Sequence, residues 1–103
     1  MKKFNLNKLY EIIERRVKSQ DKASYSYRLY KNPKLLKRKI LEEAGELTKT
    51  KNKKQVIWET SDLLYFITVF LVKRSVSLNK IEKKLEQRNI NKSTKFNKYY
   101  KKR

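Results

Sequence analysis

Carboxylates are scarce in this chain and are concentrated in one stretch of it. Ten Asp and Glu stand against 29 Lys and Arg in 103 residues, which leaves a net charge of +19. Half of the acids fall between positions 42 and 62: Glu42, Glu43, Glu46, Glu59 and Asp62. Because any acid in so basic a chain could have a basic partner, this grouping favours a bound cation, and oxygen ligands alone suit Mg²⁺.

Helical spacing would place these acids on two facing surfaces. At about 100° per residue, Glu42, Glu43 and Glu46 cover one sector of a helix. Glu59 and Asp62 lie one turn apart on the next helix, and the short connection at 49–53 predicts an antiparallel hairpin. Facing carboxylates repel each other unless they are protonated or share cations, and inward-facing carboxylates are a known way to build metal sites in helical bundles.

The alternative is that the first three glutamates form a solvated helix face. They would then pair with neighbouring cations, namely Arg38, Lys39, Lys49 and Lys51. The second pair argues against this, because Glu59 and Asp62 are the only acids between positions 47 and 81 and interrupt the most apolar helix. Acids beside Trp58 and Leu63 would lose solvation without a compensating partner.

The elements that must position these acids are predicted to be helices. One Gly and one Pro leave little turn chemistry for a sheet, and the apolar residues recur at helical spacing, so the predicted class is all-α. The absence of Cys and His excludes disulfide, thiolate and imidazole chemistry. The longest apolar run, 63–72, is too short to cross a membrane, and no export signal is visible, so we expect a cytoplasmic protein.

Four helices are expected in one domain, residues 1–88, followed by a mobile, basic, low-complexity tail, residues 89–103. The expected ranges are 6–17, 33–48, 54–74 and 78–88, with Asn32 and Ser77 as caps and a polar loop over 19–31. These helices would form an antiparallel bundle-like fold, completed by homodimerisation because the third helix is strongly apolar. Gly45, inside the second helix, permits a close backbone approach.

Three segments carry a resemblance to a known family. They are Ser24-Tyr25, Lys39-Ile-Leu-Glu-Glu-Ala-Gly-Glu-Leu47 and Trp58-Glu-Thr-Ser-Asp-Leu-Leu-Tyr65. Together, over roughly residues 6–88, they resemble phosphoribosyl-ATP pyrophosphatase, an all-α nucleoside triphosphate pyrophosphohydrolase of histidine biosynthesis, in the form fused into multifunctional fungal enzymes. The family's Mg²⁺ motif is Glu-Glu-x-x-Glu followed by Glu-x-x-Asp. Phe66 stands where many relatives have His, and Gly45 lies inside the first motif, but neither departure removes a carboxylate.

The resemblance implies hydrolysis of phosphoribosyl-ATP to phosphoribosyl-AMP and pyrophosphate. It implies that the five acids hold Mg²⁺, with Glu43, Glu46 and Asp62 as catalytic residues. The partners it implies are a second copy of the chain and phosphoribosyl-AMP cyclohydrolase in the same pathway. Residues expected to contact substrate are Lys39, Arg15, Arg16, Ser24, Tyr25, Arg28 and Tyr65.

Several alternatives remain open at this point. The cations could be ordinary exposed residues, Ser24 and Tyr25 could serve a loop turn and packing, and Trp58 and Tyr65 are assigned to the core in preference to nucleobase platforms. The second hypothesis keeps the site and changes the substrate to a (deoxy)nucleoside triphosphate, as in house-cleaning pyrophosphatases. Basic and aromatic residues interleave in the tail, as in proteins that bind single-stranded nucleic acid. A non-enzymatic, basic nucleic-acid-binding protein is therefore the third hypothesis, although a solvated tail is the preferred interpretation.

Overall fold

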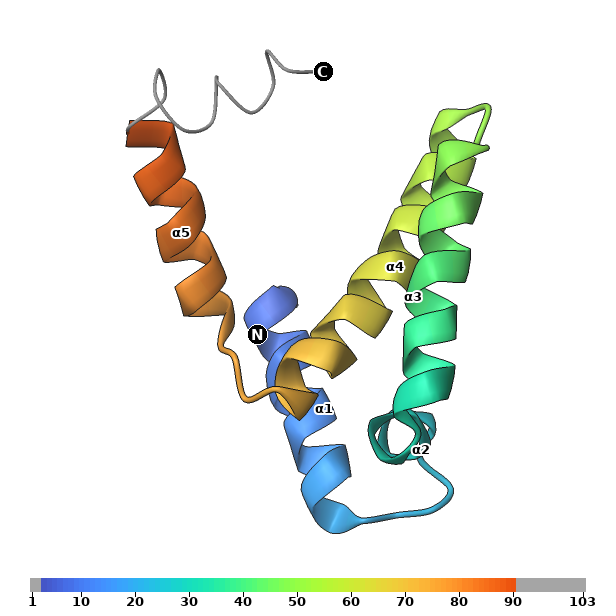
Figure 1. Cartoon of the computed structure of the whole chain (residues 1–103), viewed down its shortest axis with the longest axis vertical. Helices are drawn as coiled ribbons and strands as arrows, with labels where there is room; N and C mark the ends of the chain where they lie inside the picture. Colours follow the sequence, from blue (N-terminus) through green and yellow to red (C-terminus); the bar gives the residue numbers. More distant parts are fainter. Residues whose placement is uncertain (1–2, 91–103) are drawn as a thin grey trace.

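The structure is a computed structural model that describes residues 3–90, and this part of the chain is helical apart from its connections. Five helices follow one another (Figure 1): α1 (Leu6–Ser19), α2 (Tyr25–Lys31), α3 (Pro33–Thr48), α4 (Lys53–Lys73) and α5 (Leu78–Ile90). No strand occurs between residues 3 and 90, so the predicted all-α class is confirmed. The predicted tail lies outside the described residues from position 91 onward.

Polar side chains define where the helices begin. Asn5, Asn32 and Asn52 precede α1, α3 and α4, and each side-chain oxygen accepts a hydrogen bond from the backbone N–H three residues later, at 2.8, 3.1 and 2.9 Å. Such a cap satisfies a backbone donor that has no partner within the helix. Pro33 occupies the first turn of α3, and Ser77 accepts a backbone N–H of α5 at 3.3 Å. The predicted starts of these two helices are confirmed.

The segment predicted as a polar loop contains a helix. Ser24 caps α2 by accepting a backbone hydrogen bond at 3.3 Å, and the inner face of α2 carries Ser26 and Leu29, both buried. Seven residues are too few to show a helical period, and an isolated helix of that length is unstable in water. α2 therefore depends on its packing against other helices. The prediction of a loop over 19–31 was wrong, and the domain has five helices instead of four.

The core is small and lies where the first four helices meet. Its buried apolar side chains are Ile13, Leu29, Leu36, Phe66, Val69 and Val72. α4 supplies three of these six and packs against α1, α2 and α3, so it is the central element, as expected. α3 and α4 lie side by side and are joined by residues 49–52, which confirms the predicted antiparallel hairpin (Figure 1).

Part of the apolar surface of the hairpin is not covered within one chain. Ile57 and Trp58 on α4 are 68% and 66% exposed, and Leu41 on α3 is 63% exposed. The assignment of Trp58 to the core is therefore wrong for the single chain. The close approach expected at Gly45 is absent too, since a Cβ there would meet nothing within 4 Å. Ile57 and Trp58 are adjacent on α4 and both face solvent, and contiguous exposed apolar surface typically marks a site that binds another molecule.

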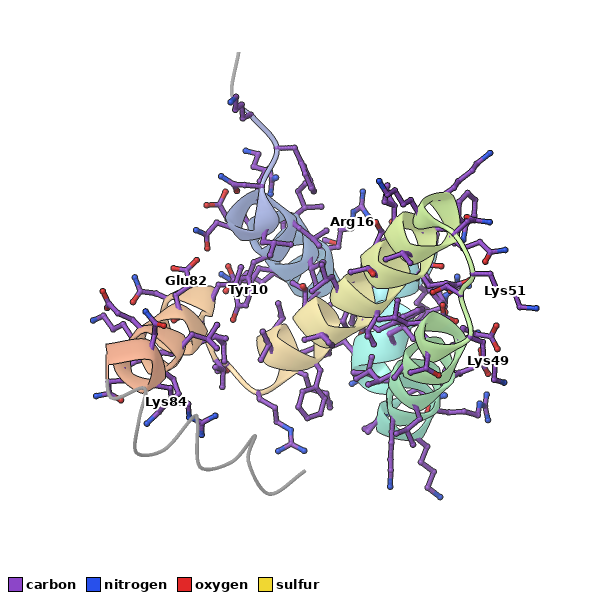
Figure 2. The ribbon with its side chains drawn as sticks, turned by 90° about the horizontal axis from the view of Figure 1, so that it is seen from above. Tyr10, Arg16, Lys49, Lys51, Glu82 and Lys84 are labelled. Atoms are coloured by element: carbon purple, nitrogen blue, oxygen red, sulfur yellow. The ribbon has the colours of Figure 1, made fainter. Side chains whose placement is uncertain are left out.

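The last helix stands apart from the hairpin. α5 diverges from α3 and α4 and packs chiefly against α1 (Figure 1), and Tyr10 lies on the side of α1 nearest to it (Figure 2). Ile81 and Leu85, which belong to its apolar stripe, are 39% and 52% exposed. The structure differs here from the predicted four-helix arrangement, because α2 takes the place beside the core that was expected for the last helix.

By length and composition, α4 could cross a membrane, with a mean hydropathy of 1.3 over its most apolar 18 residues. Core helices often meet the same criterion. α4 contributes Phe66, Val69 and Val72 to the core and carries two acids, Glu59 and Asp62, in its first half. These features indicate the central helix of a helical domain.

The burial of Leu29 tests whether α2 is part of the folded core. We expect Leu29→Ala to lower the free energy of unfolding by about 2–5 kcal/mol, because the side chain is fully buried and would leave a cavity. Urea denaturation followed by circular dichroism measures this change. Leu85→Ala, at a half-exposed leucine of α5, is the matched control and should change stability by less than about 1 kcal/mol. Equal effects of the two substitutions would contradict the placement of α2.

Candidate functional site

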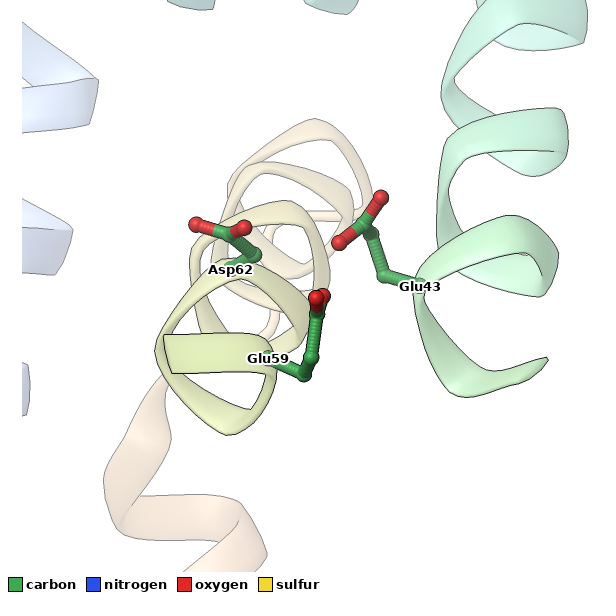
Figure 3. Close-up of side chains that lie close together, drawn as sticks. All are labelled: Glu43, Glu59 and Asp62. Atoms are coloured by element: carbon green, nitrogen blue, oxygen red, sulfur yellow. The ribbon is translucent and has the colours of Figure 1, made fainter. Parts of the chain in front are cut away.

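Three carboxylates converge where α3 and α4 face each other. One oxygen atom from each of Glu43, Glu59 and Asp62 lies within 4.8 Å of the other two, and Figure 3 shows Glu43 reaching from α3 toward the two side chains of α4. Glu59 and Asp62 are three residues apart and therefore share one face of their helix. The hairpin turns that face toward α3, so the cluster follows directly from helical spacing and antiparallel packing.

No lysine or arginine neutralises this cluster within the part of the chain that the structure describes. The ion pairs found there join Lys8 to Glu11 at 4.0 Å and Lys39 to Glu42 at 3.1 Å. The three clustered acids are half-buried, so water screens their mutual repulsion less well than at an open surface. In a chain with a net charge of +19, acids that have no basic partner favour a cation from solution.

The surroundings of Glu43 raise the pKa of its carboxyl group. Burial raises the pKa of its carboxyl group above the ordinary value, and a hydrogen bond with Glu59 raises it further, as do the negative charges of Glu59, Asp62 and Glu42. Each of these causes disfavours the ionised form of Glu43. A divalent cation would act in the opposite direction, because it favours ionised oxygen ligands. The donor set consists of carboxylate oxygens, the hard ligands that Mg²⁺ prefers, and water and substrate phosphates can complete its coordination.

The other two predicted ligands lie outside this group of three. Glu42 is exposed and accepts a hydrogen bond from the Lys39 ammonium group at 3.1 Å. Glu46 is exposed on the last turn of α3. The structure therefore brings together three of the five predicted metal ligands. Glu42 and Glu46 flank Glu43 on the helix surface, and their role in metal binding stays a prediction.

A pair of tyrosines lies next to the acidic cluster along the hairpin. Tyr65 follows Asp62 by three residues, and the rings of Tyr25 and Tyr65 are stacked, with centroids 6.3 Å apart and planes within 13°. Both rings also contact the edge or face of Phe66. The Tyr65 hydroxyl lies 2.6 Å from the hydroxyl of Ser26, which is 1% exposed. Burial raises the pKa of Tyr65 above the ordinary value for a phenol, which further favours the protonated hydroxyl.

Ser26 was not among the residues expected at the site. It lies between Tyr25 and Tyr27 in the segment predicted as a loop, and a single serine carries no spacing signal. Its partner is 39 residues away in the sequence, so only tertiary packing reveals the contact.

Three of the predicted substrate-binding cations surround these tyrosines. The Arg28 guanidinium lies 5.7 Å from the centre of the Tyr25 ring. The hydrogen bond to Glu42, followed by the charges of Glu42 and Tyr25, raises the pKa of Lys39. The charge of Arg16 acts on the Tyr65 hydroxyl, and Figure 2 shows Arg16 between α1 and the hairpin. Lys39 also interacts with the charge of Glu43, so positive charge lies near the acidic cluster.

Arg15 and Ser24 are the two other residues predicted to contact substrate. Arg15 is exposed on α1, and no contact with the tyrosines is found for it in the described residues. Ser24 caps α2 with its hydroxyl oxygen, a structural role that differs from the loop turn considered for it from the sequence. Neither position tests substrate binding, so both residues remain predictions.

Comparison with known proteins identifies the family. The family model of phosphoribosyl-ATP pyrophosphohydrolase matches residues 6–89. A histidine biosynthesis trifunctional protein of Saccharomyces bayanus is 40% identical over 88 residues, which cover 85% of this chain and 11% of that protein. The histidine biosynthesis bifunctional protein HisIE of Caldanaerobacter subterraneus is also 40% identical, over 81% of this chain and 42% of its own length.

The relatives are therefore longer than this chain, which spans about a tenth of the fungal protein and less than half of the bacterial one. No solved structure matches the chain. The matched segment contains all five helices except the last residue of α5, and it includes the whole acidic cluster. The chain belongs to the phosphoribosyl-ATP pyrophosphohydrolase family.

Proposed function

We propose that this protein hydrolyses phosphoribosyl-ATP between its α and β phosphates and releases phosphoribosyl-AMP and pyrophosphate, in a reaction that requires Mg²⁺. The observation that carries the proposal is the cluster of Glu43, Glu59 and Asp62, which has no basic partner among the described residues and lies inside the segment matched by the family. Cations beside the cluster suit a substrate with a triphosphate group.

The acidic residues are assigned to the metal. Glu43, Glu59 and Asp62 would hold it, and Glu42 and Glu46 extend the set of possible ligands. When bound, Mg²⁺ would lower the pKa of a coordinated water, screen the triphosphate and stabilise the leaving pyrophosphate. A carboxylate that is not a ligand at that moment accepts the proton of the attacking water, and Glu43, Glu46 and Asp62 are the candidates for this role.

The basic residues are assigned to the substrate. Lys39, Arg16 and Arg28 lie near the tyrosine pair and would bind phosphate oxygens that the metal does not reach. Charge-assisted hydrogen bonds from such groups orient a phosphate as well as bind it. Tyr25 and Tyr65 would form the adjacent wall, and Arg15 and Ser24 complete the proposed set of contacts.

The functional unit is proposed to be a homodimer. Among the described residues, six large apolar side chains are buried, whereas Ile57 and Trp58 on α4 remain in solvent, with Leu41 exposed on α3. A second copy would cover this surface and add to a core that is small for a domain of this size. We further propose a cytoplasmic location, with phosphoribosyl-AMP cyclohydrolase as the enzyme that consumes the product.

The substrate assignment is tested by product analysis. Purified protein should release pyrophosphate from phosphoribosyl-ATP, EDTA should stop the release, and excess Mg²⁺ should restore it. Ion chromatography distinguishes pyrophosphate from orthophosphate. Orthophosphate as the first product would contradict the proposal. Faster turnover of ATP or a deoxynucleoside triphosphate would favour the function of a house-cleaning pyrophosphatase instead.

The metal site is tested by removing one negative charge at a time. Glu43→Gln or Asp62→Asn should lower turnover about 100-fold or more, because each variant lacks a metal ligand. The melting temperature without metal should stay equal or rise, since each substitution relieves repulsion, and the stabilisation by added Mg²⁺ should shrink.

Glu86→Gln, at an exposed acid of α5, is the matched control and should behave like the wild type in all three measurements. Differential scanning fluorimetry with and without Mg²⁺ supplies the melting temperatures. A wild type that gains no stability from Mg²⁺, together with active Glu43 and Asp62 variants, would show that this cluster is not a metal site.

The proposed dimer surface is tested by placing a charge on it. Trp58→Asp should convert a dimer into monomers, because the aspartate would be buried without a partner. Phe4→Asp is the matched control, since Phe4 and Trp58 are each 66% exposed. Sedimentation velocity at micromolar concentration measures the mass of each species. A monomeric wild type, or dissociation in both variants, would contradict this surface as the interface.

A further inference from the structure

We propose that Ser26 is a positioning residue of the substrate site: its buried hydroxyl holds Tyr65, and through Tyr65 the stacked ring of Tyr25, beside the acidic cluster. This inference rests on the proposed function. The two hydroxyl oxygens are 2.6 Å apart, and they join α2 to α4 across 39 residues of sequence. Ser26 is 1% exposed, so its hydroxyl is shielded from solvent and has the Tyr65 phenol as its hydrogen-bond partner.

The position of Tyr65 on α4 connects the Ser26–Tyr65 hydrogen bond to the acidic cluster. Tyr65 follows Asp62 by three residues on α4, so the two side chains are neighbours on one face of the helix. The Tyr25 and Tyr65 rings are stacked with centroids 6.3 Å apart, so the position of the Tyr65 ring limits the positions open to Tyr25. Tyr25 is 39% exposed, and the Arg28 guanidinium lies 5.7 Å from the centre of its ring. The hydroxyl pair therefore determines where an exposed aromatic ring and a cation lie relative to the carboxylates.

Chemistry explains why the bond has this effect. A tyrosine ring on a helix can take more than one side-chain rotamer, and stacking alone permits it to slide within its own plane. A hydrogen bond at the hydroxyl fixes the far end of the side chain. α2 has only seven residues and cannot hold its own position without such contacts. The serine hydroxyl thus orders both the ring and the helix that presents Tyr25 and Arg28.

A second buried hydroxyl allows this role to be separated from ordinary stabilisation. Thr68 is 2% exposed, lies three residues after Tyr65 on α4, and donates to the backbone carbonyl of Leu64 at 2.6 Å. It stabilises its own helix and makes no hydrogen bond to α2. Thr68→Val removes this hydroxyl with almost no change in shape. It serves as the matched control for the loss of a buried hydrogen bond.

The experiment compares steady-state kinetics at saturating Mg²⁺ for the wild type, Ser26→Ala, Ser26→Thr, Tyr65→Phe, the Ser26→Ala/Tyr65→Phe double variant and Thr68→Val. Ser26→Ala should raise KM for phosphoribosyl-ATP about tenfold and leave kcat within about twofold, as expected when a group that orients bound substrate loses one hydrogen bond. Ser26→Thr keeps the hydroxyl and should restore KM. Thr68→Val should lower the melting temperature and leave KM unchanged.

The double variant tests whether the two hydroxyls act as one unit. Adding Ser26→Ala to Tyr65→Phe should change KM by less than about twofold, because the bond is already lost. Tyr65→Phe also supplies the measurement if Ser26→Ala fails to fold, since it breaks the same bond from the other side. A KM raised equally by Thr68→Val and Ser26→Ala, or unchanged in Ser26→Ala and in Tyr65→Phe, would overturn the positioning role. A wild type that releases no pyrophosphate would overturn the proposed function itself, and this inference with it.

Discussion

Repulsion among Glu43, Glu59 and Asp62 is the constraint around which the described structure is organised. Three half-buried carboxylates lie together with no basic side chain among the described residues to neutralise them. Burial, then the hydrogen bond with Glu59 and the neighbouring negative charges, raise the pKa of Glu43. Such an arrangement persists only if other interactions hold the two helices together. The core supplies them, because Leu36 on α3 and Phe66 on α4 lie further along the same hairpin. A bound cation would turn the repulsion into a contact between α3 and α4.

The hairpin is divided into two halves with different surroundings. The half that contains Leu36 and Phe66 is enclosed by α1 and α2, whereas the half that contains Ile57 and Trp58 extends away from them (Figure 1). The acidic cluster lies between the two halves. α2 reaches it from the enclosed side through the stacked tyrosines, and the exposed side presents the apolar surface proposed for a second copy. The acidic cluster thus has packed side chains of α2 on one side and solvent-exposed apolar side chains of the hairpin on the other.

Local physics explains which features could be predicted. The caps at Asn32 and Ser77, the proline at position 33 and the 3.6-residue period of the apolar side chains depend only on near neighbours, and they located α3, α4 and α5 to within a few residues. The hairpin followed from a short connection between two long helices. The facing of Glu43 with Glu59 and Asp62 then required no further information. The resemblance carried by the acidic motifs agreed with the family shown by comparison.

The sequence by itself determined the helical class, the hairpin and the acids that could meet in it, because these follow from spacing within one helix or across one short turn. Only the tertiary structure decided that α2 is a helix, that Ser26 bonds Tyr65, and that α5 stands apart while Trp58 remains in solvent. Each of these depends on groups distant in the sequence, whose relative positions are set by how the whole core packs. For a seven-residue helix, packing outweighs local propensity, and no local pattern records that outcome.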